Sequence, residues 1–63
     1  MTKTKIILDD LTEAESYALA NMCKRMIWDD FKRLSANQSE LHAMDGATIK
    51  LRRALGEAGF DPR

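Results

Sequence analysis

The sequence has very few of the residues that build disulfides or metal centres. Among its 63 residues, Cys23 is the only cysteine and His42 the only histidine. One cysteine excludes an intramolecular disulfide and is typical of a reducing cytoplasm, where we expect the protein to reside. One cysteine and one histidine are also too few for the four ligands of a structural zinc site within one chain. The sequence therefore predicts no disulfide, no metal and no cofactor.

Long apolar runs are missing too. No stretch approaches the ~18 consecutive apolar residues of a membrane-spanning helix. The apolar segment 6–8, which follows the basic N-terminus, is too short for the core of a signal peptide. With only three glycines and one proline, the chain offers no linker. We therefore expect a single domain over 1–63 that makes no contact with a membrane.

The recognisable parts of an active site are also missing. The sequence has no phosphate-binding glycine loop, no nucleophile elbow and no cluster of metal ligands. Cys23 and His42 are the one conceivable pair of nucleophile and base. The helical pattern places Cys23 on an apolar face, where a thiol resists ionisation, and His42 on the polar face of a second helix. We expect a protein that is not an enzyme and has no catalytic residue.

Charge and size both bear on the partners. Ten basic and ten acidic residues give zero net charge, which weakens a role in nucleic-acid binding, because phosphate neutralisation dominates that affinity. A chain of this size buries only roughly 60% of the surface that its unfolded form exposes. Such a monomer has marginal stability. We therefore expect self-association, as a homodimer.

Hydrophobic periodicity predicts a mainly α protein. It indicates a short N-terminal strand or extended arm over 2–8, a helix over 12–34 and a second helix over 39–58, with the helices forming an antiparallel hairpin that dimerisation completes. A lone strand leaves its backbone groups unpaired. The N-terminal segment therefore pairs with another chain, covers a helix as an arm, or is not a strand.

Local signals mark the ends of both helices. Thr12 and Glu15 form a capping box at the start of the first helix. At the start of the second, Asn37 or Ser39 can serve as the cap. The segment 59–63 is predicted to cap and follow the second helix in a Schellman arrangement, with Gly59 in a left-handed conformation, Phe60 packed back on Leu55, and Pro62 preventing continuation.

Apolar residues occupy an unusually wide part of the first predicted helix. Their arc spans roughly 240°, well beyond the ~100° stripe of a helix with one buried face. A helix of this kind is covered on two sides, and we expect its second cover to be a partner subunit. The residues expected to mediate self-association are Leu19, Met22 and Met26. The arc is formed by Leu19, Ala20, Cys23, Met26, Ile27, Phe31 and Leu34, with Tyr17, Trp28 and Met22 at its edges.

A tryptophan and a group of charges stand together in the same helix. Trp28 is the preferred anchor for an interface, because tryptophan combines a large contact area with a polar N–H. Asp29 and Asp30 are followed by Lys32 and Arg33. Ion pairs one helical turn apart explain these charges as a solvated face. The alternative is a binding surface, in which the two acids imitate a nucleic-acid backbone and fix the register of a partner.

The order strand, helix, helix with a basic start resembles the ribbon–helix–helix repressors. In that family, two chains pair their N-terminal strands into a ribbon that enters the major groove. The resemblance implies that Lys3, Lys5 and Ile7 face the DNA, whereas Thr4, Ile6 and Leu8 face the core.

A second resemblance rests on segments spread over nearly the whole chain. They are Leu11-Thr12-Glu13-Ala14-Glu15, Ala18-Leu19-Ala20, Lys24-Arg25, Trp28-Asp29-Asp30-Phe31, Leu51-Arg52-Arg53-Ala54-Leu55 and Ala58-Gly59-Phe60-Asp61-Pro62-Arg63. With these segments the chain resembles a family of short uncharacterised proteins carried by phages, prophages and mobile elements of proteobacteria. The resemblance implies a protein that binds one host protein stoichiometrically, such as an inhibitor of a CRISPR or restriction system. The alternatives are a dimeric DNA-binding regulator and a structural or assembly subunit.

Overall fold

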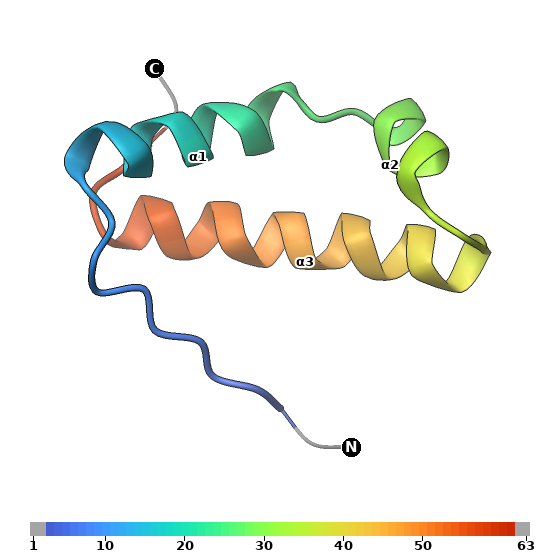
Figure 1. Ribbon diagram of the computed structural model, residues 1–63, viewed down its shortest axis with the longest axis horizontal. Coiled ribbons are helices and arrows are strands. Elements are labelled where there is room, and N and C mark those ends of the chain that lie inside the picture. Colours follow the sequence, from blue (N-terminus) through green and yellow to red (C-terminus); the bar gives the residue numbers. More distant parts are fainter. Residues whose placement is uncertain (1–2, 62–63) are drawn as a thin grey trace.

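The computed structural model describes residues 3–61. Its three helices are α1 (Glu13–Arg25), α2 (Trp28–Leu34) and α3 (Gln38–Glu57). The longest helix, α3, runs beside α1 in the opposite direction, and α2 lies near the N-terminal end of α3 (Figure 1). The prediction of a mainly α protein is confirmed.

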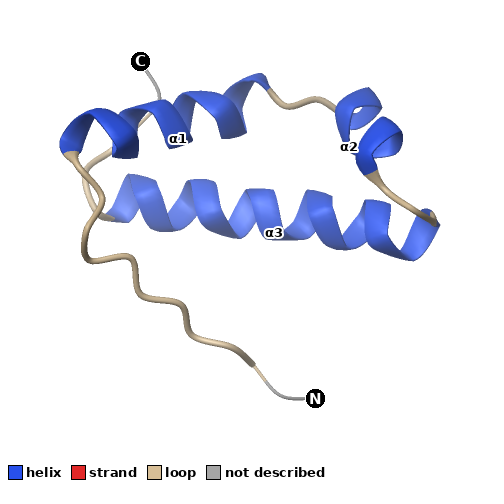
Figure 2. Cartoon of the chain, in the orientation of Figure 1, coloured by secondary structure: helices blue, strands red, loops and turns tan. Residues whose placement is uncertain are grey.

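The N-terminal segment is an extended arm (Figure 2). The sequence predicted a strand or an arm over 2–8; no strand is formed in residues 3–8, and Thr2 lies outside the described residues. The physical reason is that a strand needs a neighbour, and the described part of this chain offers none. Residues 3–10 make no backbone hydrogen bond, so their donors and acceptors face solvent.

The helix expected over 12–34 is interrupted at Met26 and Ile27, which both have extended backbone conformations. Phe31 is buried against α3, whereas Ile27 and Leu34 are exposed. A continuous helix would have pointed Ile27 and Leu34 in nearly the same direction as Cys23. The apolar residues predicted to form one wide arc therefore belong to two helices, α1 and α2, which run in different directions. The structure has no single helix with apolar residues around most of its circumference, so this argument for a partner subunit loses part of its basis.

The capping signals at the helix starts are confirmed. The Glu15 N–H donates to Thr12 Oγ1 at 3.1 Å, and the Thr12 N–H donates to Glu15 Oε1 at 2.9 Å. At the start of α3, the Glu40 N–H donates to Asn37 Oδ1 at 2.8 Å, so the cap is Asn37 and not Ser39. The Glu40 carboxylate accepts the N–H of Ala36 at 3.0 Å.

The Schellman hydrogen bonds at the end of α3 are also confirmed. The Phe60 N–H donates to the Leu55 carbonyl at 2.8 Å, and the Gly59 N–H donates to the Gly56 carbonyl at 3.0 Å. Gly59 has φ 95°, a conformation that side chains with a Cβ avoid. The ring of Phe60 then lies edge-on against Tyr17, with 5.2 Å between ring centroids. Pro62 lies outside the described residues.

The core is small for the length of the chain. Its buried apolar side chains are Ala20, Cys23, Phe31, Leu41 and Leu55. The chain exposes 5342 Å², whereas a compact protein of this mass exposes about 4,100 Å². Its extents of 33 × 29 × 17 Å describe a flat molecule. The helices therefore form a single layer, and the arm lies beside it (Figure 1).

Candidate functional site

An apolar groove lies between the arm, α1 and the C-terminal half of α3. Its volume is about 740 Å³. Ser16 is the only lining residue with a polar side chain, and its hydroxyl donates to the Thr12 carbonyl at 3.0 Å. No charged side chain lines this groove, which suits it to another apolar surface. We call it the arm groove, and its lining residues are Ile6, Leu8, Leu11, Ser16, Leu19, Leu51, Ala54, Leu55, Ala58 and Phe60.

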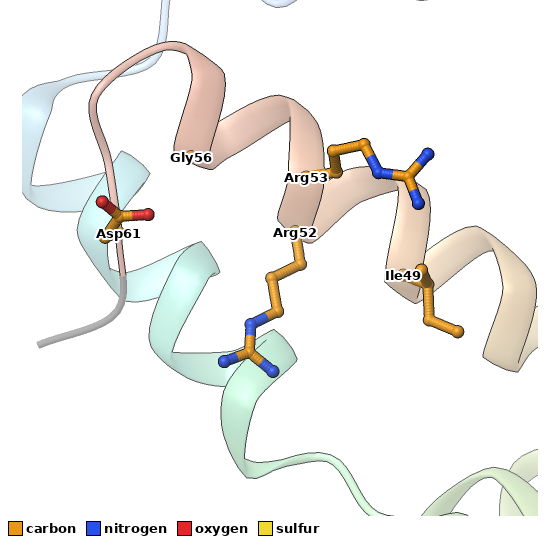
Figure 3. Close-up of a pocket in the computed structure, with 5 residues that line it drawn as sticks. All are labelled: Ile49, Arg52, Arg53, Gly56 and Asp61. Carbon is orange, nitrogen blue, oxygen red and sulfur yellow. The ribbon is translucent and has the colours of Figure 1, made fainter.

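A second, more polar depression of about 400 Å³ lies at the C-terminal end of α3. It is lined by Ile49, Arg52, Arg53, Gly56 and Asp61. Figure 3 shows that Arg52 reaches towards α1 while Arg53 points away from it, so the two guanidinium groups do not converge on one point. Within residues 3–61, no group of three or more acids, histidines or cysteines is placed to hold a metal ion. This depression has no arrangement of side chains that would enclose a ligand.

Cys23 and His42 occupy different environments. Burial raises the pKa of the Cys23 thiol, and the nearby Arg52 guanidinium opposes this shift only in part. His42 is exposed on α3 and lies against the ring of Trp28, with 5.5 Å between the ring centroids. Cys23 is therefore held as a neutral thiol in the core.

The residues expected to bind a partner all lie on α2, which we call the α2 surface. Trp28 is the first residue of α2 and is 44% exposed. Asp29, Lys32 and Arg33 are exposed. The Asp30 carboxylate accepts the Ile27 N–H at 2.9 Å and pairs with Arg33 at 3.4 Å.

Asp30 therefore has a structural role that the sequence interpretation did not assign, because it caps the first turn of α2. An acid three residues after the start of a helix is a recognisable capping signal, but Ile27 before it is not a typical cap. Asp29 is left as the exposed acid of the α2 surface.

The residues expected to mediate self-association do not all share one site. Leu19 lines the arm groove. Met22, which is 52% exposed, and Met26, at the end of α1, lie outside the groove lining. Leu51 of α3 also lines the groove but was not predicted as a site residue, because no local signal connects residues that are so far apart in the chain. Lys3 and Lys5 are exposed on the arm.

Comparison with known families matches residues 1–63 to one family over the full length. The chain belongs to the DUF7706 family. Its description is a family of unknown function, so membership assigns no activity to the arm groove or to the α2 surface. Neither the curated proteins nor the solved structures contain a match to this DUF7706 chain. None of the helices in residues 3–61 has the length and apolar character needed to cross a membrane.

Proposed function

We propose that the protein is a non-catalytic binding protein that acts by occupying a surface of another protein in a stoichiometric complex. The observation that supports this most strongly is the number of large apolar side chains in contact with solvent. Exposed apolar patches on soluble proteins mark interaction sites. Those exposed in residues 3–61 are Ile6, Ile7, Leu8, Met22, Ile27, Trp28, Leu34 and Ile49.

The α2 surface is the proposed contact with the other protein. Trp28 is half-exposed, and its contact with His42 restricts the position of the indole ring. A side chain that is already ordered loses less conformational entropy when it binds. Asp29 stands next to it as an exposed acid. The complementary surface would carry an apolar pocket for the indole and a basic group for the Asp29 carboxylate.

The proposed partner is a host protein in the bacterial cytoplasm, of the kind that a phage or mobile element must inactivate, such as a component of a CRISPR or restriction system. The sequence resemblance to short phage and mobile-element proteins supports this setting. The proposed binding unit is a homodimer, which the large exposed area of the single chain supports. Binding alone would block the host protein, so no catalytic group is needed.

A comparison of two alanine variants tests this function. Purified wild-type protein, Trp28→Ala and Ile49→Ala are each mixed with purified defence complexes, and the mass of any complex is followed by light scattering during titration. Ile49 is a suitable control because it is also exposed and apolar but lies on α3. Trp28→Ala should weaken binding ~30-fold or more, since a central tryptophan contributes ~2 kcal/mol or more to an interface. Equal effects of both variants, or no complex with any defence protein, would contradict the proposal.

A dimeric DNA-binding regulator of the ribbon–helix–helix type is the second candidate. The observation that favours it is the arm, where Lys3 and Lys5 are exposed on an extended backbone without backbone hydrogen bonds. Replacing both lysines by alanine should reduce DNA binding and its salt dependence, because each lysine that contacts a phosphate releases counterions. Electrophoretic mobility shifts with genomic fragments separate the two functions, since the double-lysine variant should still inhibit a protein target.

A further inference from the structure

We propose that the arm groove is the surface on which a second copy of this chain docks, with the arms of both copies inside the interface. This inference rests on the homodimer included in the proposed function and identifies the residues that form it. The occupant is a second copy, for three reasons that concern area, charge and the arm.

The exposed area matches what a dimer needs. The chain exposes 5342 Å², about 1,200 Å² more than a compact protein of its mass. Standard stable interfaces bury about 800 Å² on each partner. A symmetric dimer of ordinary size would therefore bring the chain close to the surface area of a typical folded protein. The flat shape, 17 Å in its shortest extent, leaves room for a second layer of helices.

The charge distribution of the groove suits self-docking. In a twofold interface the same patch contacts itself, so a residue near the axis faces its own copy. A charged residue there would meet a like charge. The arm groove has no charged lining residue, and Ser16, its one polar side chain, is already hydrogen-bonded within the chain. The patch can therefore face its own copy without like-charge repulsion.

The arm supplies the side chains that need a cover. Ile6 and Leu8 line the groove yet remain 76% and 55% exposed, because nothing lies over them. Ile7, which stands between these two residues, does not line the groove and is 71% exposed. A second copy placed over the groove would cover Ile6 and Leu8 together with Leu19 and Leu51. The polar depression on α3 has one such exposed side chain, Ile49, whereas the arm groove has both Ile6 and Leu8.

A pair of matched substitutions on α3 tests the inference. Ala54 lines the arm groove but is exposed in the single chain, so Ala54→Glu leaves the buried core untouched. Ala43→Glu places the same charge on an exposed position of the same helix, outside the groove. Light scattering over a dilution series gives the mass of each variant, and far-UV circular dichroism checks that the helices remain.

The expected result is a wild-type mass twice the 7.2 kDa of the chain, retained in Ala43→Glu. In Ala54→Glu the dissociation constant should rise ~100-fold or more, because symmetry buries the unpaired charge twice. A wild-type mass of 7.2 kDa at every concentration would overturn the homodimer together with this inference. A dimer that survives Ala54→Glu, or is lost equally in Ala43→Glu, would overturn the groove as its interface and leave the homodimer standing. Neither result bears on Trp28→Ala, so the host-protein contact is tested separately.

Discussion

Replacing Phe31 by alanine should release α2 from the rest of the molecule. Phe31 is the only buried residue of α2 and is 5% exposed. A buried phenylalanine removes about 150–250 Å² from water, and its truncation to alanine costs about 3–5 kcal/mol. A chain of 63 residues has a total stability of roughly 3–9 kcal/mol. The Phe31→Ala variant should therefore lose most of its free energy of unfolding.

Urea unfolding measures this loss with two probes. Far-UV circular dichroism follows all three helices, and the fluorescence of Trp28, the only tryptophan, follows α2. Leu34→Ala is the matched control, because Leu34 lies on the same helix but is 57% exposed, so the loss should stay below ~1 kcal/mol. If the Phe31→Ala variant is already unfolded without urea, the Phe31→Leu variant replaces it, with an expected loss of about 1 kcal/mol in the free energy of unfolding. Equal losses in Phe31→Ala and Leu34→Ala would refute the burial argument.

Three further predictions concern the N-terminal cap of α1 and two glycines in or after α3. Thr12→Ala should lower the free energy of unfolding by about 1 kcal/mol in urea titrations, whereas Thr12→Ser should leave it nearly unchanged. Hydrogen bonds from the Thr12 backbone and then from its hydroxyl hold the pKa of Glu15 below its ordinary value of 4.5. The stability that the ionised Glu15 contributes is therefore present above that ordinary value and is lost as the pH falls through the lowered pKa. Glu15→Gln should remove that part of the acid sensitivity, and an unchanged acid slope would contradict the assignment. Gly59 has φ 95°, so Gly59→Ala should destabilise the protein by about 1–2 kcal/mol in thermal melts. Gly46 lies inside α3 with open space around an added Cβ, so Gly46→Ala should stabilise the protein by about 0.5–1 kcal/mol. A change of the same sign in both variants would contradict the backbone argument.

The helix ends were predictable because their physics is local. Thr12, Asn37 and Gly59 act through hydrogen bonds that span three to five residues of sequence. A capping side chain needs only its own turn of helix to be effective. These signals are therefore visible in a sequence before any tertiary contact is known.

The break at Met26 and Ile27 was not predictable in the same way. Neither residue is a glycine or a proline, and the apolar pattern continues through both. The break allows Phe31 to be buried between α2 and α3 while Leu34 turns outward, which is a tertiary cause. The Asp30 cap is the one local trace of it.

The two candidate sites differ in the same way, because one is formed by residues close in the sequence and the other by residues far apart. The α2 surface is one short helix, so Trp28, Asp29 and their neighbours are close in the sequence as well as in the structure. The arm groove joins Ile6, Leu19 and Leu51, which come from three segments. Their meeting depends on the register between α1 and α3, and no short-range pattern sets that register.

The two aromatic contacts, Trp28 with His42 and Tyr17 with Phe60, lie near opposite ends of α3 and have a consequence for the order of folding. Trp28 and His42 are 14 residues apart in the chain, whereas Tyr17 and Phe60 are 43 residues apart. Closing the longer loop costs about 1 kcal/mol more in chain entropy. The α2–α3 corner should therefore assemble first in the transition state, and pairing of α1 with α3 should then proceed from that corner towards Phe60.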